Sequence, residues 1–303
     1  MNKSVSILGY VCAVMAVLFW SFNVIVARYF ADLFTPWQIS FYRWFFASVI
    51  LLPFCIKQII SKWDVLISNF KILFFLSLTG IVLMNTFSYF AGQTIDAVEM
   101  SLIGVMGPVL IIILSYIFLH EKISKLQLVG IGISFLGVLT IILHGHILSI
   151  GSIHFQIGDF YMFLLALFFA IYSVLSRSKP KELSQTLTLA FTIFLGLIII
   201  TPFFMFDNDL YGMVRWDKVS FLSMLGMGIF NSVLSYLFWN MALEKIGSLK
   251  ASMVYYLMPV FSSVEAYFIL GERIYVSQVY GGLLVILGIF LTNKKTNVDF
   301  ERP

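Results

Sequence analysis

The sequence predicts an all-α membrane protein in which ten transmembrane helices form two inverted five-helix repeats. The chain of 303 residues is 60% hydrophobic and 11% charged, with a mean hydropathy of +0.98, whereas about a quarter of the residues in a soluble domain are charged. Apolar segments of roughly 20 residues, enough for a helix to cross a bilayer, recur along its whole length. The two halves also match each other at a nearly constant offset.

Ten segments have the length and hydropathy of a membrane-spanning helix. The first, at 6–28, has an apolar run longer than the core of a signal peptide and no small-residue cleavage site, so we expect it to be retained. The others follow in order at 36–57, 70–91, 97–119, 125–144, 159–178, 184–205, 219–241, 248–270 and 275–293. The connections are too short to fold independently, so no extramembrane domain is expected.

The basic residues predict the orientation of these helices. With a cytoplasmic amino terminus, 14 Lys and Arg residues fall on the cytoplasmic side and four on the outside, namely Arg28, Arg215, Lys218 and Arg273. Positive residues stay on the cytoplasmic side of short loops, so both termini are predicted to be cytoplasmic. Topology thus accounts for the net charge of +4, and no nucleic-acid partner is expected.

The internal repeat pairs Pro108 with Pro259 at an offset of 151 residues. The same offset continues through Glu121/Glu272, Gly130/Gly281 and Gly137/Gly288, while earlier in each half an offset of 149 pairs Arg28 with Arg177 and Pro53 with Pro202. We therefore expect one five-helix repeat at 1–147 and a second at 148–303. Because five is odd, the second copy enters the membrane in the opposite sense, an architecture common in secondary transporters.

Two matching segments carry a resemblance to a known family. "GPVLIIILSYIFLHEKISKLQLVGIGISFLGV" and "MPVFSSVEAYFILGERIYVSQVYGGLLVILGI" resemble the paired signature of the EamA-type drug/metabolite transporter superfamily, and "FWSFNVIVAR", "FYRWFFAS" and "GDFYMFLLALFFAIYSVLSR" resemble its first, second and sixth helices. The resemblance implies a multi-pass protein of the bacterial cell (inner) membrane with a central cavity lined mainly by helices 1, 3, 4, 6, 8 and 9. It also implies transport of small metabolites, often amino acids and frequently by export.

Two charged residues lie inside the predicted spans, where an ionised group costs about 2.5 to 3.5 kcal/mol and so indicates function. Arg43 and Glu265 are each roughly 10 Å below the outer membrane surface by helical rise. We expect a coupling or gating role in which they approach each other, directly or through substrate. The alternative is that Arg43 reaches the outer interface while Glu265 bonds neighbouring hydroxyl groups. Arg43 fits the family pattern, whereas a carboxylate at Glu265 departs from it, which suggests protons as coupling ion or a cationic group on the substrate.

Pro108 and Pro259 interrupt apolar segments at equivalent positions of the two halves. Proline has no backbone N–H and clashes with the preceding helical turn, which frees the carbonyls of Gly104 and Tyr255. Freed groups within a membrane need a neighbour or a watery cavity. We expect two hinges beside a central cavity, with a static kink as the alternative.

Uncharged polar and aromatic residues within the spans are candidates for substrate binding, because a polar side chain is costly against lipid. The candidates are Trp20, Asn23, Asn85, Tyr89, Tyr172, Tyr236, Trp239 and Tyr255. A part of this set is expected only to join helices by hydrogen bonds. The glycines of 130–138 and 280–288 indicate close helix packing, with a homodimer contact as the alternative.

The sequence therefore predicts a secondary transporter, and no enzyme or cofactor. It has no P-loop, dinucleotide fingerprint or nucleophile elbow, and His144, His146 and His154 lack further ligands at metal-binding spacing. The expected substrate is an amino acid or related zwitterion that is exported. Uptake or exchange of a nucleoside, vitamin or cofactor and efflux of a cationic drug or lipid-linked substrate remain open, as do a membrane-embedded enzyme and a channel.

Overall fold

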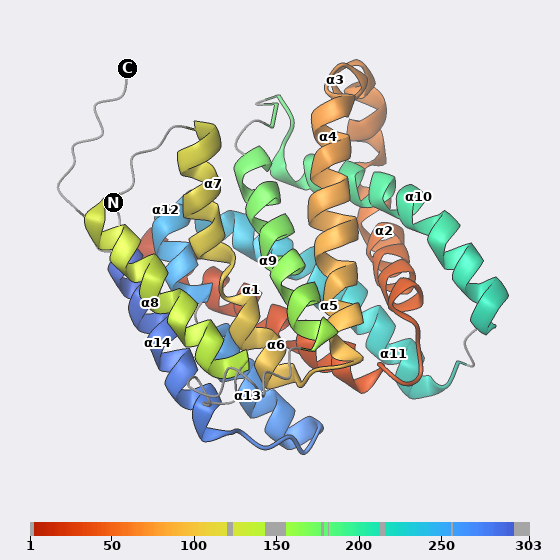
Figure 1. Ribbon diagram of the computed structural model, residues 1–303. Coiled ribbons are helices and arrows are strands. Elements are labelled where there is room, and N and C mark those ends of the chain that lie inside the picture. Colours follow the sequence, from red (N-terminus) through yellow and green to blue (C-terminus); the bar gives the residue numbers. More distant parts are fainter. Residues whose placement is uncertain are drawn as a thin grey trace.

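The computed structural model describes residues 3–119, 124–142, 156–176, 179–180, 182–212, 216–255 and 257–293, and these ranges form helices and no strand (Figure 1). The helices are α1 (Lys3–Tyr29), α2 (Pro36–Ser61), α3 (Trp63–Ser68), α4 (Phe70–Ser77), α5 (Met84–Gly92), α6 (Ala97–Gly104), α7 (Gly107–Leu119), α8 (Lys125–Ile142), α9 (Ile157–Leu175), α10 (Gln185–Tyr211), α11 (Lys218–Gly226), α12 (Ser235–Tyr255), α13 (Met258–Ile269) and α14 (Val276–Asn293). Two π-helical segments, η1 (Leu78–Leu83) and η4 (Met227–Leu234), join α4 to α5 and α11 to α12. The predicted all-α class is confirmed.

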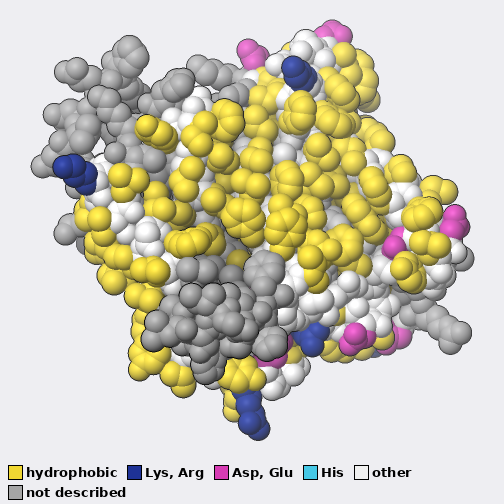
Figure 2. All heavy atoms as spheres, in the orientation of Figure 1, with side chains coloured by type: hydrophobic (Ala, Val, Ile, Leu, Met, Phe, Trp, Pro, Cys, Tyr) yellow, Lys and Arg dark blue, Asp and Glu magenta, His cyan; other side chains and the backbone are white. Residues whose placement is uncertain are grey.

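Seven helical stretches within the described ranges are long and apolar enough to cross a membrane. They are Ile7–Tyr29, Pro36–Ser61, Phe70–Gly92, Ala97–Phe118, Ile157–Leu175, Gln185–Tyr211 and Lys218–Ala242, and shorter apolar stretches lie within α8 and α14. Figure 2 shows a face whose middle is covered by hydrophobic side chains, with charged side chains toward its edges. Such a surface suits lipid, so the chain is a multi-pass membrane protein. The count of ten spans stays a prediction.

The connection expected between the eighth and ninth spans is instead helical. α12 continues without a break to Tyr255, through the start of the span expected at 248–270. Glu244 and Lys245 lower the hydropathy of this region, but both are good helix formers, and α12 contains no proline. Hydropathy reports exposure to lipid rather than the end of a helix. The apolar stretch ends at Ala242, next to the predicted end of the eighth span at 241, while the helix itself continues.

Pro108 and Pro259 each lie in the first turn of a helix rather than in its interior. Each is the second residue of its helix, α7 or α13, and these helices begin 151 residues apart. A first-turn proline removes no helical hydrogen bond, because the N–H there has no partner within the helix. Gly104 and Tyr255, where freed carbonyls are expected, are the last residues of α6 and α12. The alternative of a static kink within a continuous helix does not apply, because one helix ends and another begins before each proline. The hinge role of the two prolines stays a prediction.

α8 and α14 lie side by side and pack through glycines at equivalent positions (Figure 1). A Cβ atom added to Gly137 would lie 2.6 Å from the carbonyl oxygen of Gly281, and one added to Gly288 would lie 2.4 Å from that of Gly130. Real Cβ atoms do not approach a backbone oxygen so closely, so each contact requires glycine. The packing interpretation of these glycines is confirmed as a contact within one chain.

The buried apolar side chains form two clusters that meet at α1. One contains Val24 of α1 and Met258 of α13, and the other contains Leu76 of α4 and Leu189 of α10. Trp20 of α1 packs against both clusters. The space that remains between them is the cavity described next.

Candidate functional site

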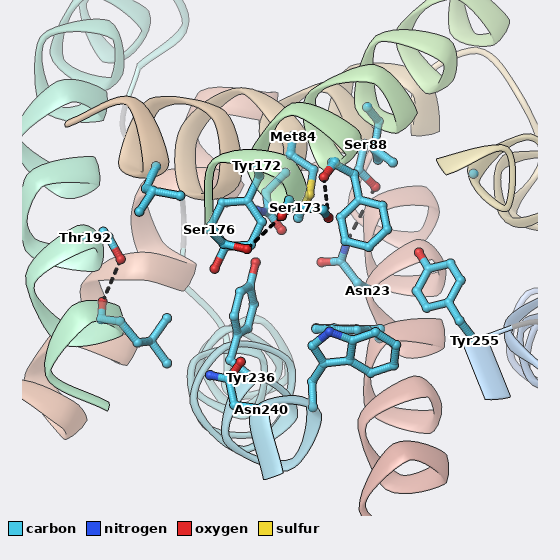
Figure 3. Close-up of a pocket in the computed structure, with 18 of the residues that line it drawn as sticks. Asn23, Met84, Ser88, Tyr172, Ser173, Ser176, Thr192, Tyr236, Asn240 and Tyr255 are labelled. Carbon is cyan, nitrogen blue, oxygen red and sulfur yellow. Dashed lines mark hydrogen bonds between the residues drawn. The ribbon is translucent and has the colours of Figure 1, made fainter. Parts of the chain in front are cut away.

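A cavity of about 390 Å³ lies between the two apolar clusters. Figure 3 shows side chains from α1, α5, α9, α10 and α12 pointing toward one space, among them Asn23, Tyr172, Tyr236 and Tyr255. Seven of the eight predicted substrate-binding residues line it, namely Trp20, Asn23, Asn85, Tyr172, Tyr236, Trp239 and Tyr255. The lining includes the helices implied by the resemblance and adds α2, through Arg43, and α10, through Thr192.

One wall of the cavity is aromatic. The Trp20 ring centroid lies 5.5 Å from that of Tyr236, 5.3 Å from that of Trp239 and 6.1 Å from that of Tyr255. Phe169 stacks on Tyr255 with a centroid separation of 5.7 Å. Tilted and edge-on rings at these separations stabilise one another, and together they offer an apolar surface to a ligand in the cavity.

Arg43 lies beside this wall with its side chain only 1% exposed. Its guanidinium donates hydrogen bonds to five oxygen atoms: Nε to Ser232 Oγ (2.7 Å), Nη1 to Asn23 Oδ1 (2.8 Å), Asn85 Oδ1 (2.7 Å) and Tyr89 Oη (2.8 Å), and Nη2 to the Asn231 carbonyl oxygen (3.0 Å). These acceptors come from α1, α5 and η4. Arg43 thus joins its own helix, α2, to these three elements. All five acceptors are neutral, and none is a carboxylate.

Two of the acceptors are held in place by further contacts. Asn85 Nδ2 donates to the carbonyl oxygens of Gly80 (2.8 Å) and Ile81 (3.3 Å), which turns Oδ1 toward Arg43. Tyr89, the predicted binding residue that does not line the cavity, is fully buried and donates to Asn23 Oδ1 (3.0 Å). The guanidinium therefore sits in a preorganised set of dipoles.

The two π-helical segments supply backbone carbonyls to this network. A π-helix shifts the hydrogen-bond ladder by one residue and leaves a carbonyl without its usual partner, often at a functional site. In η1 the Gly80 carbonyl accepts from Asn85 and from Tyr236 Oη (3.3 Å), and in η4 the Asn231 carbonyl accepts from Arg43 and from Ser235 Oγ (2.5 Å). The segments begin 149 residues apart, which is the repeat offset for this part of each half.

Glu265 does not pair with Arg43. Ser21 Oγ of α1 donates to Glu265 Oε1 (2.8 Å), and Oε2 has no hydrogen-bond partner among the described residues. The predicted direct ion pair is therefore wrong for this conformation, because the two charged side chains have different partners. Glu265 is 9% exposed and lies outside the lining of the cavity, although the residue before Ser21, Trp20, is part of that lining.

The charged residues that line the cavity are both cations. Besides Arg43 the lining contains Lys179, in the connection between α9 and α10, and among the described residues it contains no Asp or Glu. Burial lowers the pKa of Lys179, whose Nζ donates to the Leu183 carbonyl oxygen (3.3 Å). The cavity is thus electropositive, which favours an anionic group over a cationic one.

The sequence pattern missed several lining residues. Lys179 was predicted only as a basic residue of a loop. Three further lining residues, Ser88, Ser173 and Thr192, have small polar side chains, and such side chains within spans often join helices instead of lining a cavity. Thr192 lies 149 residues after Arg43, so the repeat offset was the one signal that could have indicated it. Glu99 was also missed as a buried carboxylate, being 4% exposed in the first turn of α6.

Glu272, which follows α13, and Arg28 together join α1, α5, α6 and α13 at one end of the protein. Its Oε2 accepts from the backbone N–H of Ala97 (3.1 Å) and of Val98 (3.4 Å) at the start of α6, and its Oε1 lies 4.0 Å from Arg28 Nε. Arg28 of α1 also donates to the Gly92 carbonyl oxygen at the end of α5 (3.1 Å). Burial raises the pKa of the Glu272 carboxyl more than these contacts lower it.

The described residues contain no group of three or more His, Cys, Asp or Glu placed to hold a metal ion. His144, His146 and His154 lie outside these residues.

Comparison with known proteins identifies similar chains along nearly the whole length. The model of the EamA-like transporter family matches residues 7–143 and 156–294. A Bacillus subtilis (strain 168) protein called "Uncharacterized transporter YyaM" is 30% identical over 274 residues, which cover 89% of this chain and 87% of the relative. An "Uncharacterized transporter" of Archaeoglobus fulgidus is 26% identical over 283 residues, with 93% and 96% covered. One crystal structure superposes with a TM-score of 0.63 at 16% identity, covering 96% of each chain, which supports the fold alone.

Proposed function

The chain belongs to the EamA-like transporter family, and we propose that it is a secondary transporter that moves a small organic metabolite across the bacterial inner membrane by alternating access. The observation that carries this proposal is the cavity of about 390 Å³ between two apolar clusters. Its volume falls within the range of small-molecule sites, and its few polar groups among aromatic rings are typical of them.

Alternating access rests on the proposed inverted repeats at 1–147 and 148–303. Three pairs of features at the repeat offsets support them: the starts of η1 and η4, the starts of α7 and α13, and the glycine contacts between α8 and α14. Repeats of this kind can rock about a central site. A channel would instead need a continuous open path, and a membrane-embedded enzyme would need reactive groups converging in the cavity, where the charged lining residues of the described chain are Arg43 and Lys179.

The proposed substrate is an amino acid or a related zwitterion, carried outward. Arg43 suits a carboxylate, and the rings of Trp20 and Trp239 suit an ammonium group or an apolar side chain. The proposed cytoplasmic termini put the connection between α9 and α10 on the cytoplasmic side, and Lys179 of this connection lines the cavity, which supports entry of substrate from inside. Cationic drugs are a weaker candidate because two cations and no carboxylate line the described part of the cavity.

A metabolite screen in proteoliposomes tests the proposed function. Labelled amino acids, nucleosides and vitamins would be loaded inside vesicles that contain the purified full-length protein, and flux would be followed as a function of concentration. Saturable flux of at least one amino acid, competed by its unlabelled form, is the expected result. Flux that rises linearly with concentration for every solute would contradict a transporter that occludes its substrate.

We also propose that Glu265 takes up and releases a proton during the cycle. Its carboxyl group is buried, one oxygen has no partner in the described chain, and its contact with Ser21 links it to the helix that bears Trp20. Glu265→Gln should leave binding intact and remove the dependence of flux on a pH gradient. Flux that is driven equally by the gradient in wild type and in this variant would exclude Glu265 as the coupling group.

A further inference from the structure

The Arg43 guanidinium is a buried positive charge that only neutral groups surround. Its five hydrogen-bond acceptors are uncharged, and its central carbon lies 4.6 Å from the centroid of the Trp44 ring. Within the described chain the one ion pair joins Arg28 to Glu272. A buried charge without an opposite charge is costly, so an anionic ligand in the adjacent cavity gains an interaction that the protein itself does not provide.

The Arg43 guanidinium has donor capacity that such a ligand can use. The two hydrogens of Nη1 face three oxygens, whereas the two hydrogens of Nη2 have one acceptor among the described residues. Of the three oxygens, that of Asn85 is held by two backbone carbonyls, and Tyr89 is fully buried. Asn23 is only partly buried, lines the cavity, and anchors its Nδ2 by a long contact to Ser88 Oγ (3.4 Å). Its Oδ1 also accepts from Tyr89 Oη (3.0 Å), a hydrogen bond that a ligand carboxylate in its place can accept instead. Asn23 is therefore the acceptor that can be displaced.

We propose that Arg43 forms a carboxylate-binding subsite, in which a substrate carboxylate displaces Asn23 Oδ1 and bridges Nη1 and Nη2. Guanidinium favours this bidentate geometry, and charged hydrogen bonds of this kind are about twice as strong as neutral ones. The aromatic wall formed by Trp20, Tyr236, Trp239 and Tyr255 then receives the apolar remainder of the ligand. This inference rests on the proposed transport function and adds the chemical group that its cavity selects.

Ligands that differ in one group test the subsite by binding to the purified full-length protein in detergent. Two probes carry a carboxylate: phenylalanine, and phenylpropionate, which lacks the ammonium group. Two carry none: phenylalaninamide, which has a neutral amide in its place, and phenethylamine, which has neither a carboxylate nor an amide. We expect both carboxylates to bind at least about 10-fold more tightly than the amide and the amine. Equal binding of the four probes, binding of the amines alone, or no binding of either carboxylate overturns the proposal.

Asn23→Asp is the decisive variant, because it places a carboxylate where Asn23 Oδ1 now lies, 2.8 Å from Arg43 Nη1. This internal anion should occupy the subsite, so that carboxylate probes bind about 10- to 100-fold more weakly while the melting temperature is at or above that of wild type. Asn240→Asp is the matched control, since Asn240 lines the same cavity and is not among the five hydrogen-bond acceptors of Arg43. We expect a smaller loss in this variant. Equal losses in the two variants would mean that any negative charge added to the cavity weakens carboxylate binding, which would overturn a specific subsite at Arg43.

Transport distinguishes this proposal from the function on which it rests. Saturable transport of neutral or cationic solutes, unaffected by Asn23→Asp, would keep the transporter and overturn the subsite. Tight carboxylate binding that Asn23→Asp abolishes, without flux of any carboxylate, would keep the subsite and overturn the transporter.

Discussion

Arg43 combines two tasks that single residues in membrane proteins often perform separately. Its hydrogen bonds hold α1, α5 and η4 against α2, and its charge faces a cavity without a described carboxylate. Glu265 performs only the first of these tasks, because its contact with Ser21 joins α13 to α1 but its carboxylate lies outside the cavity lining. The two charges thus contact different residues of α1, Asn23 in the case of Arg43 and Ser21 in the case of Glu265.

The stabilising role of Arg43 predicts that Arg43→Gln destabilises the protein. The variant loses charged hydrogen bonds and leaves buried acceptors unpaired, which we expect to cost about 3 kcal/mol. A lower melting temperature in detergent, followed by intrinsic fluorescence, checks this. Lys71→Gln, at an exposed position of α4, is the control and should melt like wild type; equal melting of all three proteins would refute the structural role.

Glu272 predicts a dependence of stability on pH. Burial raises its carboxyl pKa above the ordinary value of 4.5, so the folded protein keeps this proton at pH values where the unfolded chain has lost it. Stability from this group is therefore full at low pH and falls as the pH rises through that window. Glu272→Gln cannot lose a proton, so its melting temperature should rise relative to wild type as the pH is raised above the ordinary carboxyl pKa of 4.5. A relative fall would mean that the Arg28 ion pair outweighs burial.

At the scale of elements, the breaks and π-helical segments decide where backbone groups become available. α6 and α12 end before Pro108 and Pro259, and η1 and η4 expose the carbonyls of Gly80 and Asn231 to side chains. The positions at which these helices are interrupted could be predicted from sequence, because proline lacks a backbone N–H and clashes with the preceding helical turn. The π-helical segments could not, because their stretches read as ordinary apolar helix and the shift of the ladder depends on the tertiary contacts of Arg43, Asn85 and Tyr236.

The α8–α14 contact predicts a sharp difference between two glycines on one helix. Gly137→Ala puts a methyl group 2.6 Å from a backbone oxygen of α14, whereas a Cβ atom at Gly132 meets nothing within 4 Å. Gly137→Ala should lower the melting temperature, with a cost of about 1 to 3 kcal/mol from overpacking. Gly132→Ala should leave it unchanged or raise it, because alanine favours a helix by up to about 1 kcal/mol. Equal effects would mean that α8 and α14 do not pack in this register.

The helix break at Pro259 predicts an effect on transport rate. Pro259→Ala permits α12 and α13 to merge across Leu257, which would stiffen the proposed hinge. We expect slower flux with unchanged probe affinity, measured in proteoliposomes and in detergent respectively. Pro53→Ala, within α2, is the control; if it slows flux as much as Pro259→Ala, the break has no special role.

At the scale of the whole molecule, composition and hydropathy were enough to predict an all-α membrane protein. The two repeats stay a proposal, which the starts of η1 and η4 and of α7 and α13 at the repeat offsets support. The cavity could be predicted in large part, because polar and aromatic residues within spans avoid lipid: seven of eight candidates line it. The sequence did not predict in which direction around the helix bundle the side chains of Arg43 and Glu265 face. Sequence gives the depth of Arg43 and Glu265 along their helices, but the side of the bundle that each faces is set by helix rotation and packing.

Exchange across the membrane tests the central claim most directly, namely that a carboxylate is carried by a protein with one alternately exposed site. Proteoliposomes would be loaded with an unlabelled amino acid identified by the screen, and entry of the same labelled amino acid would be measured in wild type and Asn23→Asp. The account predicts saturable entry that internal substrate accelerates, and its loss in Asn23→Asp. Entry that is indifferent to internal substrate and equal in both proteins would contradict it.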